Sequence, residues 1–214
     1  MKKQDKFKIQ VNKDHYYNNY DDILRWISYY YQIDNILKLK PKSVLEIGVG
    51  NKTTYNYLKD KINITTCDFD KNLKPDIVGD IRNLPIKDKT YDVVCAFEVL
   101  EHIPFSDFKK AIKELKRVSK KYVIISIPYS SIYFNNVFKF PLINRIFHKR
   151  FIEMTIKIPL FFKKHKFNGE HYWEIGKKGY PIKKIRKIIK TEYKIIKEES
   201  SLLNKYHYYF ILQK

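Results

Sequence analysis

The sequence predicts an α/β fold built on a doubly wound, mainly parallel β-sheet with helices on both faces. Between residues 41 and 128, almost continuously apolar runs of β-formers alternate with helical patterns, which is typical of parallel strands buried on both sides. The first of these runs ends in a glycine turn that leads into a helix. A length of 214 residues is enough for one sizeable core, so we expect a single domain over residues 1–214.

The N-terminal part, residues 1–40, is predicted to form a helical cover over this core. Between Asp14 and Lys40, apolar residues recur at spacings of three and four, namely at Ile23, Trp26, Ile27, Tyr30, Ile33 and Leu37. This spacing predicts a helix with these side chains on its apolar face. Pro41 is expected to end the helix.

Residues 41–128 are predicted to alternate between strands and helices. We expect strands at residues 43–49, 64–69, 77–81, 91–98 and 122–127, and helices near 52–61 and from Ser106 onwards. The second helix would carry one apolar face, made by Phe108, Ala111, Ile112, Leu115 and Val118. Such elements stack helices against both faces of a parallel sheet.

The regular pattern breaks at Pro128. Residues 129–180 are rich in aromatic and basic side chains without clean periodicity, so we expect an insertion or lid over the carboxyl ends of the strands, where it contacts the substrate. Residues 181–214 regain regularity, with a helix at 181–192 and extended runs at 193–203 and 206–213. The short link between these runs, Asn204 and Lys205, predicts a C-terminal hairpin.

The net charge of +20 is concentrated in the second half of the chain. Residues 1–100 carry 17 basic and 14 acidic side chains, and residues 101–214 carry 26 and 9, which gives +3 and +17. A basic region interleaved with phenylalanines favours either an anionic partner such as RNA or a peripheral contact with an anionic membrane. The alternative is a lysine-rich solvated surface that results from compositional bias.

We expect a cytoplasmic location. Neither a signal peptide nor a membrane-spanning segment is evident in the sequence. Cys67 and Cys95 lie in apolar runs without CxxC spacing, as buried free thiols do in a reducing compartment.

Acidic residues and glycines at successive strand ends predict a nucleotide-type cofactor site. Gly48 and Gly50 would let a ligand approach the main chain after the first strand, and the carboxylate of Glu46 would hold an ammonium group. About 20 residues later, Asp68 is placed to accept both hydroxyls of a ribose. Asp80 would bind an adenine edge together with the main chain of Ile81.

These motifs, in this order, resemble the class I S-adenosylmethionine-dependent methyltransferases. The resemblance covers residues 41–128 and rests on residues 44–50 (VLEIGVG), 67–70 (CDFD), 79–81 (GDI) with Leu84 and Pro85, 91–94 (YDVV) and 97–102 (FEVLEH). It implies a Rossmann-like, seven-stranded sheet with an antiparallel last strand, S-adenosylmethionine as cofactor, and Glu98 in the cofactor pocket. A nicotinamide dehydrogenase is the competing interpretation, but the third glycine of its motif would fall at Thr53.

Methyl transfer from a sulfonium requires alignment of a nucleophile and removal of its proton. Two segments carry candidate groups for these tasks, residues 98–102 (EVLEH) and 169–176 (GEHYWEIG). His102 and His171 are the candidate catalytic residues, and Tyr129, His171 and Glu174 are the candidate substrate contacts. For His171, the alternative is a histidine satisfied by a main-chain carbonyl.

Residues 98–102 with His171 are also similar to two groups of methyltransferases that use a divalent metal, namely the ubiquinone-biosynthesis O-methyltransferases and the small-RNA 3′-terminal 2′-O-methyltransferases. This resemblance implies Glu98, Glu101, His102 and His171 as candidate ligands of Mg or Mn. The alternative is that residues 98–102 only line the cofactor pocket, as in methyltransferases without a metal.

The sequence therefore predicts a methyltransferase that O-methylates a small metabolite or a glycan precursor. A metal-assisted RNA 2′-O-methyltransferase is the alternative, because of the +17 half of the chain. A non-catalytic module that binds S-adenosylmethionine or RNA is a third interpretation, which the retained glycines and acidic strand ends disfavour.

Overall fold

The computed structural model describes residue 9, residues 13–16, residues 20–140 and residues 151–214. Its elements in chain order are η1 (Lys13–Tyr16), α1 (Ile23–Lys38), β1 (Ser43–Ile47), α2 (Thr53–Leu58), β2 (Asn63–Asp68), η2 (Lys71–Leu73), β3 (Ile77–Val78), β4 (Tyr91–Phe97), η3 (Leu100–His102), α3 (Phe105–Val118), β5 (Ser119–Pro128), β6 (Ser131–Phe138), β7 (Ile152–Pro159), α5 (Ile182–Ile189), β8 (Lys194–Ser200) and β9 (His207–Gln213). Parts of the predicted N-terminal cover and of the predicted insertion, including residues 141–150, lie outside the described residues.

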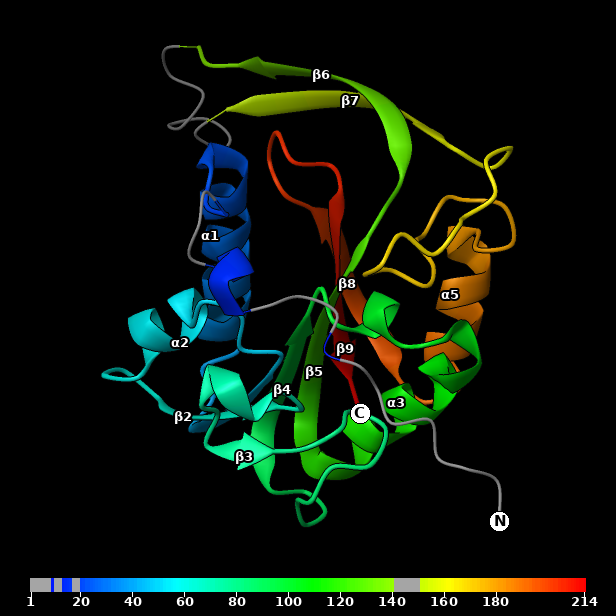
Figure 1. Ribbon diagram of the computed structural model, residues 1–214. Helices are drawn as coiled ribbons and strands as arrows, with labels where there is room; N and C mark the ends of the chain where they lie inside the picture. Colours follow the sequence, from blue (N-terminus) through cyan, green and yellow to red (C-terminus); the bar gives the residue numbers. More distant parts are fainter. Residues whose placement is uncertain (1–8, 10–12, 17–19, 141–150) are drawn as a thin grey trace.

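A seven-stranded sheet forms the centre of the molecule, in the order β3-β2-β1-β4-β5-β9-β8 (Figure 1). The pairs among β1 to β5 are parallel, whereas β9 runs antiparallel to both β5 and β8. The predicted fold class is therefore confirmed, including the C-terminal hairpin and the antiparallel last strand.

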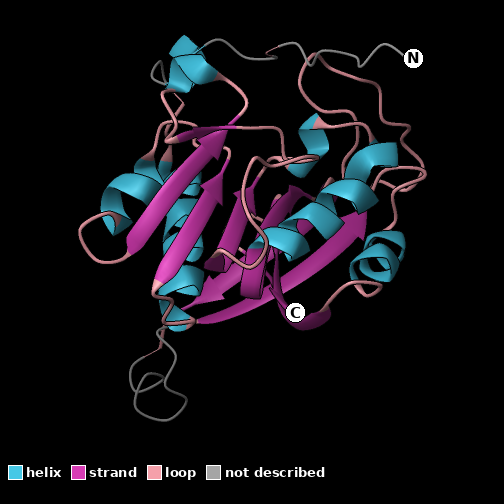
Figure 2. Ribbon diagram, turned by 90° about the horizontal axis from the view of Figure 1, so that it is seen from below, coloured by secondary structure: helices cyan, strands magenta, loops and turns pink. Residues whose placement is uncertain are grey.

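Helices cover the sheet on both faces (Figures 1 and 2). On one side, Ile36 of α1 and Leu58 of α2 pack against Val44 and Val93 of the strands. On the other side, the apolar faces of α3 and α5 pack in a larger core, where the predicted α3 face is buried throughout, at Phe108, Ala111, Ile112, Leu115 and Val118. These two layers fix the strand ends that carry the candidate site residues.

Helix α1 covers the sheet with a different face from the predicted one. Ile23 and Tyr30 of the predicted apolar face are 73% and 63% exposed, and the buried side chains are Ser28, Tyr29, Gln32, Asn35 and Ile36. The reason is that the surface beneath α1 offers polar partners. Thr54 Oγ1 of α2 donates to Gln32 Oε1 at 2.7 Å, and Asn204 Nδ2 of the β8–β9 connection donates to Ser28 Oγ at 3.2 Å.

The predicted insertion contains regular structure that the sequence analysis missed. Strands β6 and β7 pair antiparallel as a separate two-stranded sheet, the β6–β7 ribbon. Figure 1 shows the ribbon beyond the carboxyl end of β5, at the top of the molecule. None of the helices in the described part of the chain combines the length and apolar character needed to cross a bilayer.

Candidate functional site

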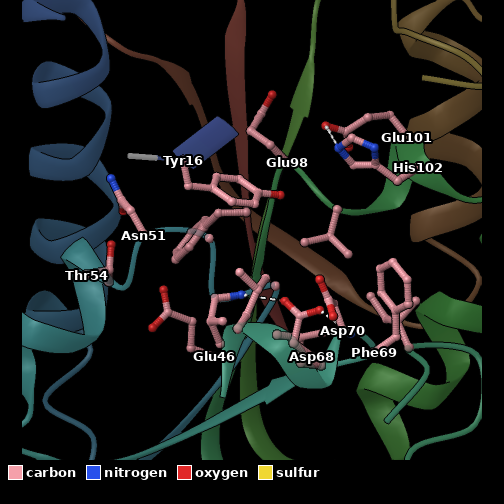
Figure 3. Close-up of a pocket in the computed structure, with 18 of the residues that line it drawn as sticks. Tyr16, Glu46, Asn51, Thr54, Asp68, Phe69, Asp70, Glu98, Glu101 and His102 are labelled. Carbon is pink, nitrogen blue, oxygen red and sulfur yellow. Dashed lines mark hydrogen bonds and ion pairs between the residues drawn. The ribbon is translucent and has the colours of Figure 1, made fainter. Parts of the chain in front are cut away.

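A pocket of about 460 Å³ lies at the carboxyl ends of the central parallel strands (Figure 3). The turn after β1, the acidic end of β2 and the segment after β4 line it, as do parts of the N-terminal region and of the β8–β9 connection. The candidate cofactor residues Glu46, Gly48, Gly50, Asp68, Asp80, Ile81 and Glu98 are all among its lining residues.

The glycine turn after β1 needs glycine for steric reasons. Gly48 and Gly50 have φ angles of +81° and +46°, in the left-handed region that favours glycine. A Cβ atom on Gly48 would also lie 2.3 Å from Cγ2 of Val99. The turn thereby exposes main chain to the pocket, as a ligand that approaches the backbone closely requires.

Glu46 contributes a buried carboxylate to this pocket. Its side chain is 4% exposed, and its Oε2 has no hydrogen-bond partner among the described residues. Burial raises the pKa of Glu46 to about 8, and the positive charge of Lys52 opposes the shift. A buried acid without a partner is costly, and a bound cation would offset this cost.

Asp68 ends β2 with its carboxylate fixed by the main chain. Its Oδ2 accepts a hydrogen bond from Val49 N and its Oδ1 from Asp70 N, both at 2.9 Å. Burial raises the pKa of Asp68, and these hydrogen bonds oppose the shift. Because a carboxylate oxygen has two lone pairs, both oxygens keep capacity for a further donor, as a diol offers.

Asp80 lies in the pocket wall but already has a strong partner. The guanidinium of Arg82 contacts both carboxylate oxygens, with Nη2 2.5 Å from Oδ2 and Nε 3.0 Å from Oδ1. Burial alone would raise the pKa of Asp80, but these contacts outweigh burial and lower it. Whether the carboxylate binds an adenine edge stays a prediction, and Ile81 beside it is a buried apolar wall.

Three of the four candidate metal ligands come together at the other end of the pocket. Ligand atoms of Glu101, His102 and His171 lie within 4.8 Å of one another. Glu101 is fully buried, and neither of its carboxylate oxygens has a hydrogen-bond partner in the described structure. Burial, followed by the charge of Glu98, raises the pKa of Glu101 well above its usual value.

Glu98 does not join this group. Its Oε2 lies 3.7 Å from Nε2 of His207, and its Oε1 is buried without a hydrogen-bond partner within the described part of the chain. Its φ angle of +53° is strained for a residue with a side chain, and such strain clusters at functional sites. Glu98 therefore lines the pocket beside the three-residue cluster rather than within it.

The two histidines are oriented by groups behind them. Nδ1 of His102 lies 3.1 Å from the carbonyl oxygen of Glu170. Burial, with a smaller contribution from His171, lowers the pKa of His102 to about 4, so its imidazole is neutral at pH 7. Nδ1 of His171 hydrogen bonds to Oε1 of Glu174 at 3.1 Å, while its Nε2 lies 4.0 Å from Oε1 of Glu101.

Glu174 was predicted to contact the substrate, but it is buried behind His171 and does not line the pocket. Burial alone would raise the pKa of Glu174, yet hydrogen bonds from His171, Ser130 and Lys177 hold it well below its usual range. Glu174 is thus an ionised group that orients His171.

Tyr129, which was also predicted to contact the substrate, does not line this pocket. Its side chain is buried outside the pocket, with Lys157 Nζ 3.6 Å above its ring and Tyr208 packed edge-on. A residue directly after the fifth strand points into the pocket only if the chain turns there. In this molecule the chain continues into the ribbon instead, and Tyr129 packs at its base.

Several residues from the two ends of the chain line the pocket without having been predicted from the sequence. They are Tyr16, Tyr20, Arg25, Tyr206 and His207. The ring of Tyr16 lies about 3.7 Å from the position a Cβ on Gly50 would take, so it closes one side of the pocket (Figure 3). No local spacing signals these residues, because only the tertiary fold brings them to the strand ends.

Comparison with known proteins places the core in a family. Residues 45–127 match the family model described as a methyltransferase domain. An uncharacterized protein of Methanocaldococcus jannaschii is 32% identical over 116 residues, which cover 50% of this chain and 48% of that protein. The chain thus matches about half the length of this curated relative.

Solved structures show the same fold over most of the chain. An S-adenosylmethionine-dependent methyltransferase of Clostridium acetobutylicum is 14% identical, with a TM-score of 0.58, and 94% of this chain and 95% of that chain are covered. The 1,6-didemethyltoxoflavin-N1-methyltransferase of Burkholderia thailandensis, solved with bound 1,6-didemethyltoxoflavin and S-adenosylhomocysteine, is 10% identical, with a TM-score of 0.59 and coverage of 94% of this chain and 84% of that chain. The family match and the ordered motifs of residues 44–102 identify residues 45–127 as a methyltransferase domain, and the chain as a whole has the class I, Rossmann-like methyltransferase fold.

Proposed function

We propose that the protein transfers a methyl group from S-adenosylmethionine to a hydroxyl group of a small acceptor. The observation that carries this proposal is the cluster of Glu101, His102 and His171 in the pocket wall. Figure 3 shows Glu101 and His102 at the opposite end of the pocket from Glu46 and Asp68. One end of the pocket has the groups that suit a nucleoside cofactor with an amino group. The other end has the groups that accept a proton from a hydroxyl.

The cofactor end fits S-adenosylmethionine on three observations. The buried Oε2 of Glu46 has no hydrogen-bond partner in the described residues, and it would pair with the cofactor's ammonium group. The carboxylate of Asp68, fixed by two main-chain hydrogen bonds, would accept the ribose hydroxyls. The main chain at Gly48 and Gly50 is open to the pocket, and Asp80 with Ile81 would flank the adenine.

The acceptor end supplies proton removal. When bound, the sulfonium of S-adenosylmethionine supplies an already activated methyl group, so the protein has to align the acceptor and take its proton. We assign proton acceptance to His102 or His171. The pKa of His102, lowered to about 4, keeps its imidazole neutral but makes it a weak base. His171 is the better base of the two, because the hydrogen bond to Glu174 fixes its ring with Nε2 turned towards Glu101.

The same cluster fits a divalent cation. Two oxygens of Glu101 without hydrogen-bond partners and two imidazoles form an oxygen–nitrogen ligand set that suits Mn or Mg. The Glu174–His171 hydrogen bond is the kind of outer contact that orients a metal-binding histidine. Bound there, the cation would lower the pKa of an acceptor hydroxyl.

Metal binding is testable without turnover. The free protein is titrated with Mn²⁺, and binding is measured as the decrease in the electron paramagnetic resonance signal of the free ion. We expect one Mn²⁺ site per protein molecule. The site should disappear in Glu101→Gln and persist in the exposed control Asp60→Asn. A wild-type protein that leaves the Mn²⁺ signal unchanged removes the metal from the proposal and leaves the histidines as bases.

The acceptor class is tested by methyl transfer into fractionated cell extract from S-adenosylmethionine with a labelled methyl group, with and without chelator. We expect label in small, nuclease-resistant molecules, attached through oxygen as determined by mass spectrometry and NMR. Nuclease-sensitive label would instead support RNA, our second candidate, which the +17 charge of residues 101–214 favours. Label attached to nitrogen would contradict the proposed O-methylation.

A further inference from the structure

The β6–β7 ribbon has two chemically different faces. Side chains that pair across an antiparallel ladder point to the same side of the sheet, and successive side chains along a strand alternate. One face of the ribbon is formed by Ile132, Phe134, Asn136 and Phe138 opposite Ile158, Ile156, Met154 and Ile152. Seven of these eight residues are large and apolar, and we call this set the apolar ribbon face.

The opposite face of the ribbon contacts the body of the protein. The hydroxyl of Tyr133 donates to the carbonyl oxygen of Leu203 at 3.2 Å, and Lys157 Nζ donates to that of Lys205 at 2.8 Å. Glu153 pairs with Lys205 Nζ at 2.6 Å. Because Tyr133, Glu153 and Lys157 hold the polar face against the β8–β9 connection, the apolar ribbon face is turned away from the protein.

Exposure values agree with this orientation. Phe134 and its partner Ile156 are 66% and 67% exposed, and Met154 is 62% exposed. The polar-face residues Glu153 and Lys157 are only partly exposed. Monomeric proteins in water rarely present contiguous apolar surface of this kind, and where they do it commonly marks an interaction site.

The charges beside the apolar ribbon face are positive. The described residues of the ribbon and its flanks, 131–140 and 151–167, contain one acidic residue, Glu153, which is paired with Lys205. Apart from Lys157, which is held on the polar face by its hydrogen bond to Lys205 O, the same residues contain Lys139, Lys163, Lys164 and Lys166. Between β7 and Lys163, Phe161 and Phe162 add two more exposed aromatic rings.

We propose that the apolar ribbon face docks on an anionic lipid bilayer. The apolar side chains would enter the boundary between headgroups and acyl chains, and the flanking lysines would extend to the lipid phosphates. A second copy of the chain is a poorer occupant, because a dimer would bring together two molecules of net charge +20 each. An anionic membrane matches both the apolar face and its positive surroundings.

Docking in this orientation places the acceptor end of the pocket near the bilayer. Leu203 and Lys205, which hold the ribbon, directly precede Tyr206 and His207 of the pocket wall. The base of the ribbon is fixed to the same segment, since Tyr129 N donates to Tyr206 O at 2.7 Å. Docking on a membrane requires no particular methyl acceptor, so the docking proposal can be tested independently of the proposed O-methylation.

The test is flotation of the full-length protein with vesicles made of equal parts phosphatidylcholine and phosphatidylglycerol, and with vesicles of phosphatidylcholine alone. The test variant is F134S/I156S, which changes one cross-strand pair of the apolar ribbon face. The matched control, V78S/I196S, changes two exposed apolar residues of β3 and β8, away from the ribbon. Thermal melting of each variant by circular dichroism checks that the fold is intact.

We expect the wild-type protein to float with the anionic vesicles and to bind neutral ones at least about tenfold more weakly. F134S/I156S should lose about tenfold or more in partition to anionic vesicles, and V78S/I196S should match the wild type. Equal partition of F134S/I156S and wild type would overturn the proposal. The proposal would also be overturned if the wild-type protein did not bind vesicles and instead formed a dimer in sedimentation velocity, or bound RNA, and F134S/I156S abolished that dimer or that RNA binding.

Discussion

Burial of Glu46 without a partner for Oε2 lowers the stability of the free protein, and under the proposed function the same carboxylate would bind the cofactor. A buried carboxylate without a partner disfavours the charged form, which is why burial raises the pKa of Glu46 to about 8. A cofactor ammonium group would require the ionised form. Binding at neutral pH should therefore release protons, because the bound cation lowers a pKa that lies above the solution pH.

The sign of the pH dependence follows from this shift. The folded protein holds the proton of Glu46 more tightly than the unfolded chain, whose ordinary value is 4.5, so stability is lost as pH rises from about 4.5 through 8. Glu46→Gln should remove this loss and stabilise the free protein at pH 9 by at most about 5 kcal/mol, with no gain near pH 4.5. Chemical denaturation across this range measures it, with Asp60→Asn as control. Parallel curves for wild type and Glu46→Gln would contradict the assigned pKa.

Asp68 is the residue on which cofactor binding should depend most. Asp68→Ala removes the carboxylate and also frees Val49 N and Asp70 N, so the turn loses its anchor together with the proposed ribose contact. We expect S-adenosylhomocysteine to raise the Tm of the wild type and of Asp60→Ala, and to leave that of Asp68→Ala unchanged. Asp68→Asn, which keeps an acceptor oxygen, should retain part of the effect. Full stabilisation of Asp68→Ala would refute the cofactor assignment.

The sequence predicted those pocket residues that lie at the ends of the parallel strands, and it did not predict those that come from the two ends of the chain. Glu46 lies near the end of β1 and Asp68 ends β2, and parallel strands bring their carboxyl ends to one edge of the sheet, so sequence position implied spatial proximity. Tyr16 and His207 reach the same pocket from the two ends of the chain. Their place depends on how the N-terminal segment and the last hairpin close over the sheet, which no local pattern encodes.

At the scale of elements, α1 illustrates why apolar periodicity alone does not identify a buried face. The helix was predicted correctly, but its buried side is held by hydrogen bonds from α2 and from the β8–β9 connection. These partners are distant in sequence, so the pattern within α1 could not reveal them. The ribbon was missed for a different reason. Residues 152–158 alternate apolar and polar as a strand does, but the surrounding aromatic and basic residues obscured the period.

The corrected orientation of α1 predicts opposite outcomes for two substitutions in the same helix. Gln32→Ala leaves the hydroxyl of Thr54 without its acceptor in a buried position and should destabilise the protein by about 1–2 kcal/mol. Ile23→Ala, at a site that is 73% exposed, should change stability by less than about 0.5 kcal/mol. Urea unfolding compares the two directly. A larger loss of stability for Ile23→Ala than for Gln32→Ala would show that α1 buries the face predicted from its apolar periodicity.

At the scale of the whole molecule, the protein combines a methyltransferase sheet with an appended two-stranded ribbon. The sheet was predictable because β1, β4, β5 and β9 contain local apolar runs and the order of the motifs fixed the topology. The ribbon contributes no strand to that sheet, and it contacts the body chiefly through its polar face. Cofactor binding and membrane docking should therefore be separable.

Replacement of residues 132–158 by a short Gly-Ser linker tests this separation. Ser131 and Pro159 face each other in the ladder, so a tight connection can join them without strain on β5. Lys205 loses its partner Glu153, but the deletion also opens its side chain to water, which removes the cost of an unpaired buried charge. We expect cooperative unfolding and a Kd for S-adenosylhomocysteine within about threefold of the wild type, since the described ribbon residues do not line the pocket. Binding to anionic vesicles should be lost in the same protein. If the shortened chain no longer binds S-adenosylhomocysteine, or unfolds without cooperativity, the ribbon is part of the catalytic core and not an appended docking element.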